Sequence, residues 1–100
     1  MSKQMTVAEY FSHAIHLSGK TQKQIADEAG FNKPNIISMM KQGITKVPIY
    51  KVPALAEACG ADQVQFTSLA MAEYNPEIWA VLQEVKGEYL SERTSSIKRI

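Results

Sequence analysis

The sequence predicts an all-α protein, a compact bundle of about five to six short helices. Apolar residues recur at helical spacing in successive short segments of the chain. At the start of two of these segments, a threonine precedes a glutamate or glutamine by three residues, which is the spacing of a capping box. Glycine or proline marks several segment ends. At 100 residues, the chain is long enough for one domain with a buried core.

The first predicted helix spans residues 7 to about 17. Thr6 and Glu9 stand three residues apart at its start and predict a capping box. His13 and His16 lie on this helix and, with Glu9, supply some of the ligands that a metal needs. No further histidine or cysteine stands at ligand spacing. We therefore expect partly exposed helix histidines, with no metal and no cofactor.

The second predicted helix covers residues 21–29 and has one narrow apolar face. Thr21 and Gln24 form the second capping-box pair at its start. Gly30 follows its last residue. Glycine adopts the left-handed conformation at a helix C-terminus at little cost, so the helix should end there.

A third short helix follows after a tight turn. Asn32 is its expected N-cap, and Pro34 fits its first turn, where no backbone N–H is needed. The helix is expected to reach about Lys41 and to stop near Gly43. Two short helices joined by a tight turn are what a helix-turn-helix requires.

The positions that must be apolar to lock such a helix pair are apolar in this chain: Ile25, Ala29, Phe31, Ile36 and Met39. Ala26 stands where the crossing helices leave room for little more than a methyl group. This pattern resembles the helix-turn-helix of the Cro/CI-like (XRE) family of phage and bacterial repressors. The resemblance extends over residues 18 to about 62 and implies a lambda-repressor-like DNA-binding domain with its helix-turn-helix at about 21–42. It also implies a transcriptional regulator, and it suggests repression. Because one such domain touches only about half a turn of DNA, we expect it to bind a palindromic operator as a homodimer.

The resemblance further implies that the outward half of the third helix reads bases in the major groove of double-stranded DNA. The expected base-reading residues are Lys33, Pro34, Asn35, Ile37 and Ser38. On a helical wheel, Ile36 and Met39 face the core, which leaves Ile37 exposed where a thymine methyl group would explain it. Lys33 and Asn35 can each reach a base or a phosphate, and both interpretations stay open.

Phosphate contacts are expected at the edges of the helix-turn-helix. The free amides and the positive dipole end at the start of the second helix favour a phosphate. The predicted phosphate contacts are Thr21, Gln22, Lys23, Lys41, Thr45 and Lys46. The whole chain has a net charge of only +1, but residues 20–51 carry +4 and residues 52–92 carry −6. The helix-turn-helix side is therefore the one expected to face a polyanion.

Two further helices are predicted before residue 75. Pro53 fits the first turn of a helix over residues 52–59. Cys59 is its last residue and the only cysteine, and we interpret it as a small buried apolar side chain because no activating partner stands next to it. Asp62 is the expected N-cap of a helix over residues 63–73.

Asn75 and Pro76 divide the chain into a helix-turn-helix DNA-binding domain, residues 1–74, and a C-terminal helix with a basic tail, residues 75–100. This sixth helix is expected over at least residues 76–85 and is rich in apolar residues. The candidate dimerisation residues are Ile78, Trp79, Leu82, Val85 and Tyr89. A contiguous exposed apolar patch usually marks a partner surface. The same residues could instead pack inside the monomer, and both alternatives stay open.

The alternative to a DNA-binding regulator is a protein-interaction module of the same fold, such as an antitoxin that holds a toxin with its C-terminal helix. An enzyme is not expected, and no catalytic residue is predicted, because the chain has no nucleophile–base pair, metal cluster or glycine-rich phosphate loop. No stretch approaches a membrane span and no signal peptide heads the chain. We therefore expect a cytoplasmic protein with no membrane partner.

Overall fold

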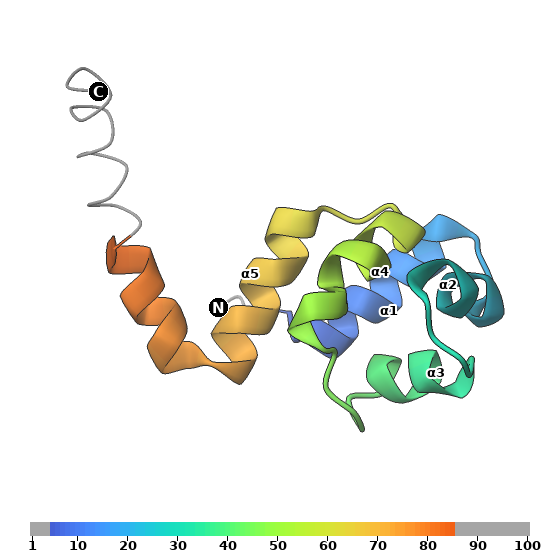
Figure 1. The fold of residues 1–100 in the computed structure, drawn as a ribbon, viewed down its shortest axis with the longest axis horizontal. Helices are drawn as coiled ribbons and strands as arrows, with labels where there is room; N and C mark the ends of the chain where they lie inside the picture. Colours follow the sequence, from blue (N-terminus) through green and yellow to red (C-terminus); the bar gives the residue numbers. More distant parts are fainter. Residues whose placement is uncertain (1–4, 86–100) are drawn as a thin grey trace, which may run out of the picture.

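The computed structural model describes residues 5–85, and each regular element in that range is a helix (Figure 1). The elements are α1 (Val7–Ser18), α2 (Gln22–Ala29), α3 (Asn35–Lys41), the short 3-10 helix η1 (Ile49–Lys51), α4 (Val52–Cys59) and α5 (Gln63–Tyr74). Residues 76–85 form a further helical segment. The predicted all-α bundle of short helices is confirmed. No helix within residues 5–85 is long and apolar enough to cross a membrane.

The core lies between α1, α4 and α5, and α2 and α3 close one end of it (Figure 1). Phe11 of α1 and Phe66 of α5 are fully buried, with ring centroids 5.7 Å apart. Ile25 of α2 and Leu55 of α4 are fully buried in the same cluster. Cys59 is 5% exposed, which confirms that it is a buried side chain. Burial of large apolar side chains at this level contributes about 1.5–3 kcal/mol each, so these contacts hold the helix-turn-helix against the bundle.

Local hydrogen bonds fix the starts of α1 and α2. The Thr6 hydroxyl accepts from the Glu9 amide at 3.1 Å, and the Glu9 carboxylate accepts from the Thr6 amide at 2.9 Å. Thr21 and Gln24 repeat this exchange at 3.1 and 2.8 Å. Each capping box satisfies two backbone amides that the helix itself leaves unpaired. The two predicted capping boxes are confirmed.

The ends of α2 and α4 are alike. Gly30 and Gly60 follow these helices in the left-handed conformation, with φ of +84° and +72°. The next residue in each case, Phe31 or Ala61, donates its amide to the carbonyl five residues earlier at 2.8 Å. These glycine caps end both helices where the sequence predicts, because a side chain at positive φ would be strained.

The helix α3 differs from its prediction in start and in orientation. It begins at Asn35, after Pro34 in the N-cap position with no side-chain cap, so Asn32 does not cap it. Ile37 is 0% exposed and Met40 is 1% exposed. The predicted exposure of Ile37, and its role in reading bases, are therefore wrong. The side of α3 that faces the core is thus rotated by about one residue, or about 100°, relative to the predicted wheel.

Residues 76–85 follow α5 after a single non-helical residue, Asn75 (Figure 1). The Asn75 carbonyl accepts the amide of Trp79 at 2.8 Å, which is the first turn of the new helix. This segment extends away from α2 and α3, and the division of the chain near residue 75 therefore corresponds to a change of direction (Figure 1). Apolar side chains of this segment remain exposed.

Candidate nucleic-acid interface

The outward face of α3 is polar. With Ile37 and Met40 against the core, the residues on the opposite side are Asn35, Ser38, Met39 and Gln42. Asn35 and Gln42 are exposed, and Ser38 and Met39 are half-buried. The Gln42 side-chain amide donates to the Ser38 hydroxyl at 3.0 Å. Amide side chains on an exposed helix face can make paired hydrogen bonds to adenine in a major groove.

The predicted base-reading residues therefore divide into two groups. Lys33 and Pro34 lie in the turn before α3 and are exposed, and Asn35 and Ser38 stay on the outward face. Ile37 belongs to the core instead. Met39 and Gln42 were not predicted as site residues. The signal that could have identified them is the pair Ile37 and Met40, spaced three apart, as an alternative core stripe.

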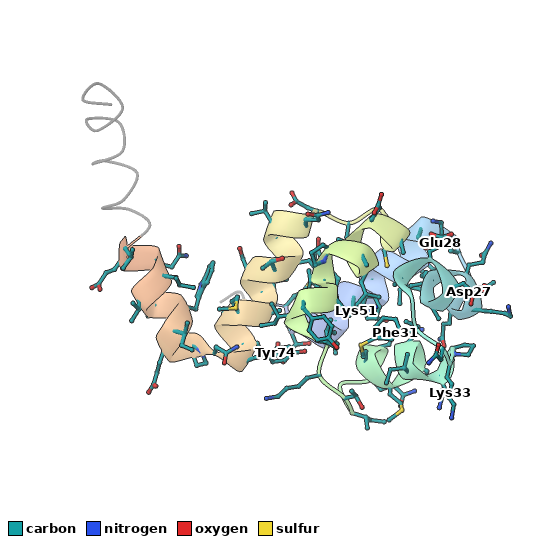
Figure 2. The ribbon with its side chains drawn as sticks, viewed as in Figure 1. Asp27, Glu28, Phe31, Lys33, Lys51 and Tyr74 are labelled. Carbon is teal, nitrogen blue, oxygen red and sulfur yellow. The ribbon has the colours of Figure 1, made fainter. Side chains whose placement is uncertain are left out.

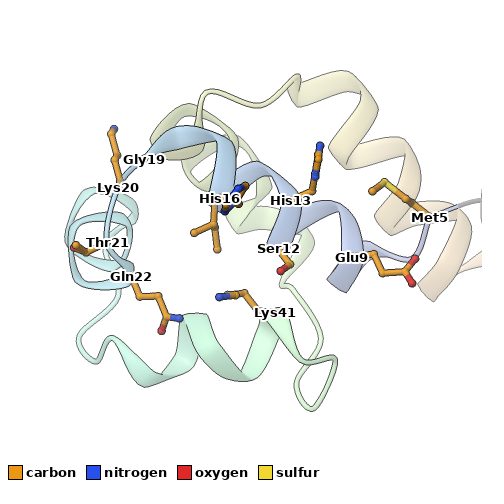
Figure 3. A pocket seen from close by; sticks show the side chains of 11 residues that line it. Met5, Glu9, Ser12, His13, His16, Gly19, Lys20, Thr21, Gln22 and Lys41 are labelled. Atoms are coloured by element: carbon orange, nitrogen blue, oxygen red, sulfur yellow. The ribbon is translucent and has the colours of Figure 1, made fainter.

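The predicted phosphate contacts at the start of α2 lie beside α3. Thr21 and Gln22 of the α2 start and Lys41 of α3 line one open groove of about 850 Å³ (Figure 3). In Figure 3, the Gln22 and Lys41 side chains extend into the space between α2 and α3. His13 and His16 of α1 also line this groove, although neither was expected to be near the predicted site. Thr21 uses its hydroxyl to cap α2.

Three lysines of the basic segment have partners within the described chain. The Lys23 ammonium lies 3.3 Å from the Asp27 carboxylate on the exposed surface of α2. Lys20 forms a 2.7 Å ion pair with Glu28 and donates to the Ala58 carbonyl at 2.9 Å. An exposed pair such as Lys23–Asp27 contributes little to stability, so Lys23 remains available to a phosphate.

Lys51 is the third of these lysines. Its ammonium donates to the Ala29 carbonyl at 3.0 Å and lies 4.9 Å from the centroid of the Phe31 ring (Figure 2). Lys33, Lys41 and Lys46 form no ion pair within residues 5–85. The positive charge free to meet a polyanion is therefore concentrated around α3.

The loop after α3 carries Thr45 and Lys46, the last two predicted phosphate contacts. The Thr45 amide donates to the Met39 carbonyl at 3.4 Å. The Lys46 ammonium lies 5.3 Å from the centroid of the Tyr74 ring, and the Lys46 side chain is exposed. The Tyr74 hydroxyl accepts the Val47 amide at 3.0 Å. The end of α5 thus fixes the loop on the far side of α3 from the α2 start.

Burial raises the pKa of one cysteine and two tyrosine side chains. Burial raises the pKa of the Cys59 thiol from 9.0 to about 11, so it is a weak nucleophile. Burial also raises the pKa of Tyr74 and of Tyr10. Among residues 5–85, no three side chains of histidine, cysteine, aspartate or glutamate are grouped to hold a metal.

The C-terminal helical segment exposes a row of apolar side chains. Ile78 and Val81 are each 55% exposed, Val85 is 50% exposed and Leu82 is 44% exposed. Ile78, Leu82 and Val85, three of the candidate dimerisation residues, are thus exposed in the described chain. Trp79 is half-buried. Tyr89, the remaining candidate dimerisation residue, lies outside the described residues.

No protein-family model matches the chain, and neither a curated protein nor a solved structure is significantly similar to it. The resemblance to the Cro/CI-like family is therefore supported only by the residues of the helix-turn-helix. The function has to be argued from the geometry of α2, α3 and the lysines around them.

Proposed function

We propose that the protein is a sequence-specific DNA-binding transcriptional regulator of the Cro/CI-like (XRE) type that places α3 in the major groove and binds a palindromic operator as a homodimer. Repression is the mode of regulation that the resemblance suggests. The observation that carries the proposal is the outward face of α3, which carries the exposed amides of Asn35 and Gln42 and is bordered by lysines without an ion-pair partner in residues 5–85.

Base reading is assigned to Asn35, Ser38 and Gln42, with Lys33 at the N-terminal end of the same surface. Asparagine and glutamine can donate to and accept from adenine in a bidentate pair, and lysine can donate to guanine. The half-buried Met39 adds an apolar surface between them. One good bidentate pair discriminates against a wrong base by about 1–3 kcal/mol, so two amide side chains are enough for a clear sequence preference.

Phosphate binding is assigned to both sides of α3. Gln22 and Lys41 face the groove at the α2 start, and Lys46 lies on the loop that Tyr74 fixes. Two separated sets of backbone contacts fix the register and tilt of a helix in the groove. Each lysine that neutralises a phosphate adds about one unit to the dependence of binding on salt.

A homodimer is proposed because one α3 touches only part of a DNA turn. Two copies related by a two-fold axis would present their α3 helices to half-sites about 34 Å apart. The exposed row formed by Ile78, Val81, Leu82 and Val85 is the candidate contact between copies. Its four members follow the i, i+3, i+4, i+7 spacing of an amphipathic helix face.

The direct test is selection of bound duplexes from a random DNA pool by the full chain. We expect a consensus with two-fold symmetry. Asn35→Ala and Gln42→Ala should each relax the preference at a limited number of positions in each half-site. Ile44→Ala, which alters an exposed apolar side chain just beyond α3, is the matched control and should leave the consensus unchanged.

Selection without enrichment of any sequence would contradict the proposal, as would a consensus that neither Asn35→Ala nor Gln42→Ala alters. An enriched sequence without two-fold symmetry would support sequence-specific binding by α3 and contradict the homodimer. The three results are separable because the amide variants test α3 and the symmetry of the consensus tests the assembly.

A second function is favoured by the exposed apolar row of residues 76–85. A module that holds a different protein with this helix, as an antitoxin holds a toxin, would cover the same side chains. The two functions differ in the solution mass of the purified chain. A self-associated chain that selects DNA supports the regulator, whereas a monomer that binds no DNA and co-purifies with a second chain at fixed stoichiometry supports the interaction module.

A further inference from the structure

The helices α2 and α4 run antiparallel and are joined at both ends by lysines. Lys51, at the start of α4, donates to the Ala29 carbonyl at the end of α2 at 3.0 Å. Lys20, just before α2, donates to the Ala58 carbonyl near the end of α4 at 2.9 Å. A positive charge beside the last carbonyls of a helix is favourable, because those carbonyls are unpaired and carry the negative end of the dipole.

The contact of Lys51 is directed at the turn of the helix-turn-helix. Its ammonium meets three consecutive residues there: the Ala29 carbonyl, the Phe31 ring at 4.9 Å, and Gly30 between them (Figure 2). A Cβ atom added at Gly30 would lie 3.1 Å from the Lys51 nitrogen. Gly30 therefore supplies both the positive φ and the space that the ammonium occupies.

The helix α3 depends on this turn for its direction. It has seven residues, and neither its N-cap residue Pro34 nor any side chain in its first turn caps it. Ile37 and Met40 attach one side of it to the core, and Ile36 is partly buried against the same cluster. At its C-terminal end, α3 continues into the loop that Tyr74 fixes. At its N-terminal end, its direction depends on the point at which the chain leaves α2, and Lys51 contacts that point.

We propose that Lys51 is a positioning residue that holds the Ala29–Phe31 turn against α4 and thereby sets the direction of α3, without contacting DNA itself. The DNA part of this inference rests on the proposed function. The proposed role of Lys51 differs from that of the phosphate-binding lysines, although Lys51 and those lysines lie in the same basic segment. A positioning lysine affects the discrimination between sequences, whereas a phosphate-binding lysine affects all sequences alike.

The first test compares Lys51→Met with Lys46→Met. Methionine keeps an apolar stem of similar length and removes the charge. For Lys51→Met we expect the affinity ratio between a selected duplex and a scrambled duplex to fall roughly tenfold, since a hydrogen bond from a charged donor is lost, with the salt dependence of binding unchanged. For Lys46→Met we expect equal loss on both duplexes and a salt slope smaller by about one unit.

A second test needs no DNA. Amide hydrogen exchange reports local opening, and the Phe31 amide is hydrogen-bonded to the Ala26 carbonyl at 2.8 Å. In Lys51→Met, exchange of the amides of residues 31–37 should rise roughly tenfold relative to those of α5. Unchanged exchange in this region would overturn the positioning role whatever the DNA measurements show.

The variant Lys51→Arg covers the case in which Lys51→Met does not fold. Arginine keeps the charge. If Lys51 binds a phosphate, the Lys51→Arg protein should therefore retain the wild-type affinity for both duplexes. The guanidinium is larger than the ammonium that lies 3.1 Å from a Cβ built at Gly30 and cannot reproduce that close contact. If Lys51 is a positioning residue, we therefore expect Lys51→Arg to lose preference for the selected duplex. Equal loss on both duplexes with a reduced salt slope in Lys51→Met, or full retention of the preference in both Lys51 variants, would overturn the inference. A wild-type chain that fails to distinguish the duplexes would instead contradict the proposed function, and the exchange experiment would still decide the role of Lys51.

Discussion

The hydroxyl of Tyr74 accepts the backbone amide of Val47 at 3.0 Å, which joins the last residue of α5 to the loop that follows α3. The two residues are 27 positions apart in the chain. Val47 is buried, so its amide has no easy access to water. This bond links the loop that carries Lys46 to the point where the C-terminal helical segment begins.

The first prediction concerns this bond. Tyr74→Phe removes the acceptor and leaves the Val47 amide unpaired, so we expect a loss of about 1–3 kcal/mol in the free energy of unfolding. Urea denaturation followed by circular dichroism measures it. Tyr50→Phe is the matched control because the Tyr50 side chain is 82% exposed. An equal loss in both variants would show that the Tyr74 hydroxyl has no special role.

The second prediction tests the orientation of α3. Ile37→Ala should lower the free energy of unfolding by about 2–5 kcal/mol, because it leaves a cavity at a fully buried position. Ile44→Ala, at a site 66% exposed, should change it by less than about 0.5 kcal/mol. Thermal or urea unfolding of both variants gives the comparison. If the Ile37→Ala protein has normal stability and an altered DNA preference, the result would instead support an exposed Ile37 that contacts bases.

The third prediction concerns Lys41, which lines the groove shared with the start of α2. Lys41→Ala should weaken binding to selected and scrambled DNA equally and lower the slope of log affinity against log salt by about one unit. Lys41→Arg keeps the charge and should keep the slope. Fluorescence anisotropy titrations at several salt concentrations measure both quantities. A slope that Lys41→Ala leaves unchanged would remove Lys41 from the phosphate-binding set.

The fourth prediction concerns self-association. Leu82→Glu places a charge in the exposed apolar row of residues 76–85, and desolvating that charge in an interface is costly. We expect a monomer by analytical ultracentrifugation with the helical circular dichroism of the wild type, since Leu82 is exposed in the single chain. Leu17→Glu makes the same change at an exposed leucine of α1 and should leave the dimer intact. If both variants sediment as the wild type does, the row is not the interface.

The fifth prediction is a pH effect of Cys59. Its pKa is raised by burial to about 11 in the folded chain, against an ordinary value of 9.0. The unfolded chain therefore loses this proton first, and the stability that the buried thiol provides, complete below pH 9, should fall between pH 9 and 11. Cys59→Ala keeps the tyrosine ionisations, so the difference between the two stability curves isolates the thiol. Parallel curves across this range would contradict the expected shift.

Most helix starts and ends, α3 excepted, were predictable because their determinants are local. The capping boxes at Thr6 and Thr21 each join residues three positions apart, and the glycine caps depend on one φ angle. Residues this close in sequence interact in the same way whatever the rest of the chain does. The all-α fold and most helix bounds followed from such signals.

The orientation of α3 was not predictable in this way. Ile36 and Ile37 are adjacent, as are Met39 and Met40, so two helical stripes offset by one residue are equally apolar. Local spacing does not decide between them, because the choice depends on how α3 packs against α1 and α2. The burial of Ile37 follows from this tertiary choice.

The partners of Lys20 and Lys51 could not be predicted from the sequence either. Lys20 and Lys51 were counted only as positive charge, yet their ammonium groups donate to carbonyls 38 and 22 residues away. Lysine carries its charge on a long flexible stem, so its partner is set by the fold. A net charge computed over residues 20–51 consequently overstates the charge that is free to meet a ligand.

The single-residue joint at Asn75 has a consequence for any two-fold complex on DNA. Only one non-helical residue separates α5 from the segment that follows. In a dimer joined through residues 76–85, the two α3 helices would therefore have little freedom to change their separation or relative rotation. One added base pair between half-sites rotates one of them by about 34° around the duplex axis. The tolerated number of central base pairs should then be narrow, and operator length would act as a second layer of discrimination beside the identity of the bases.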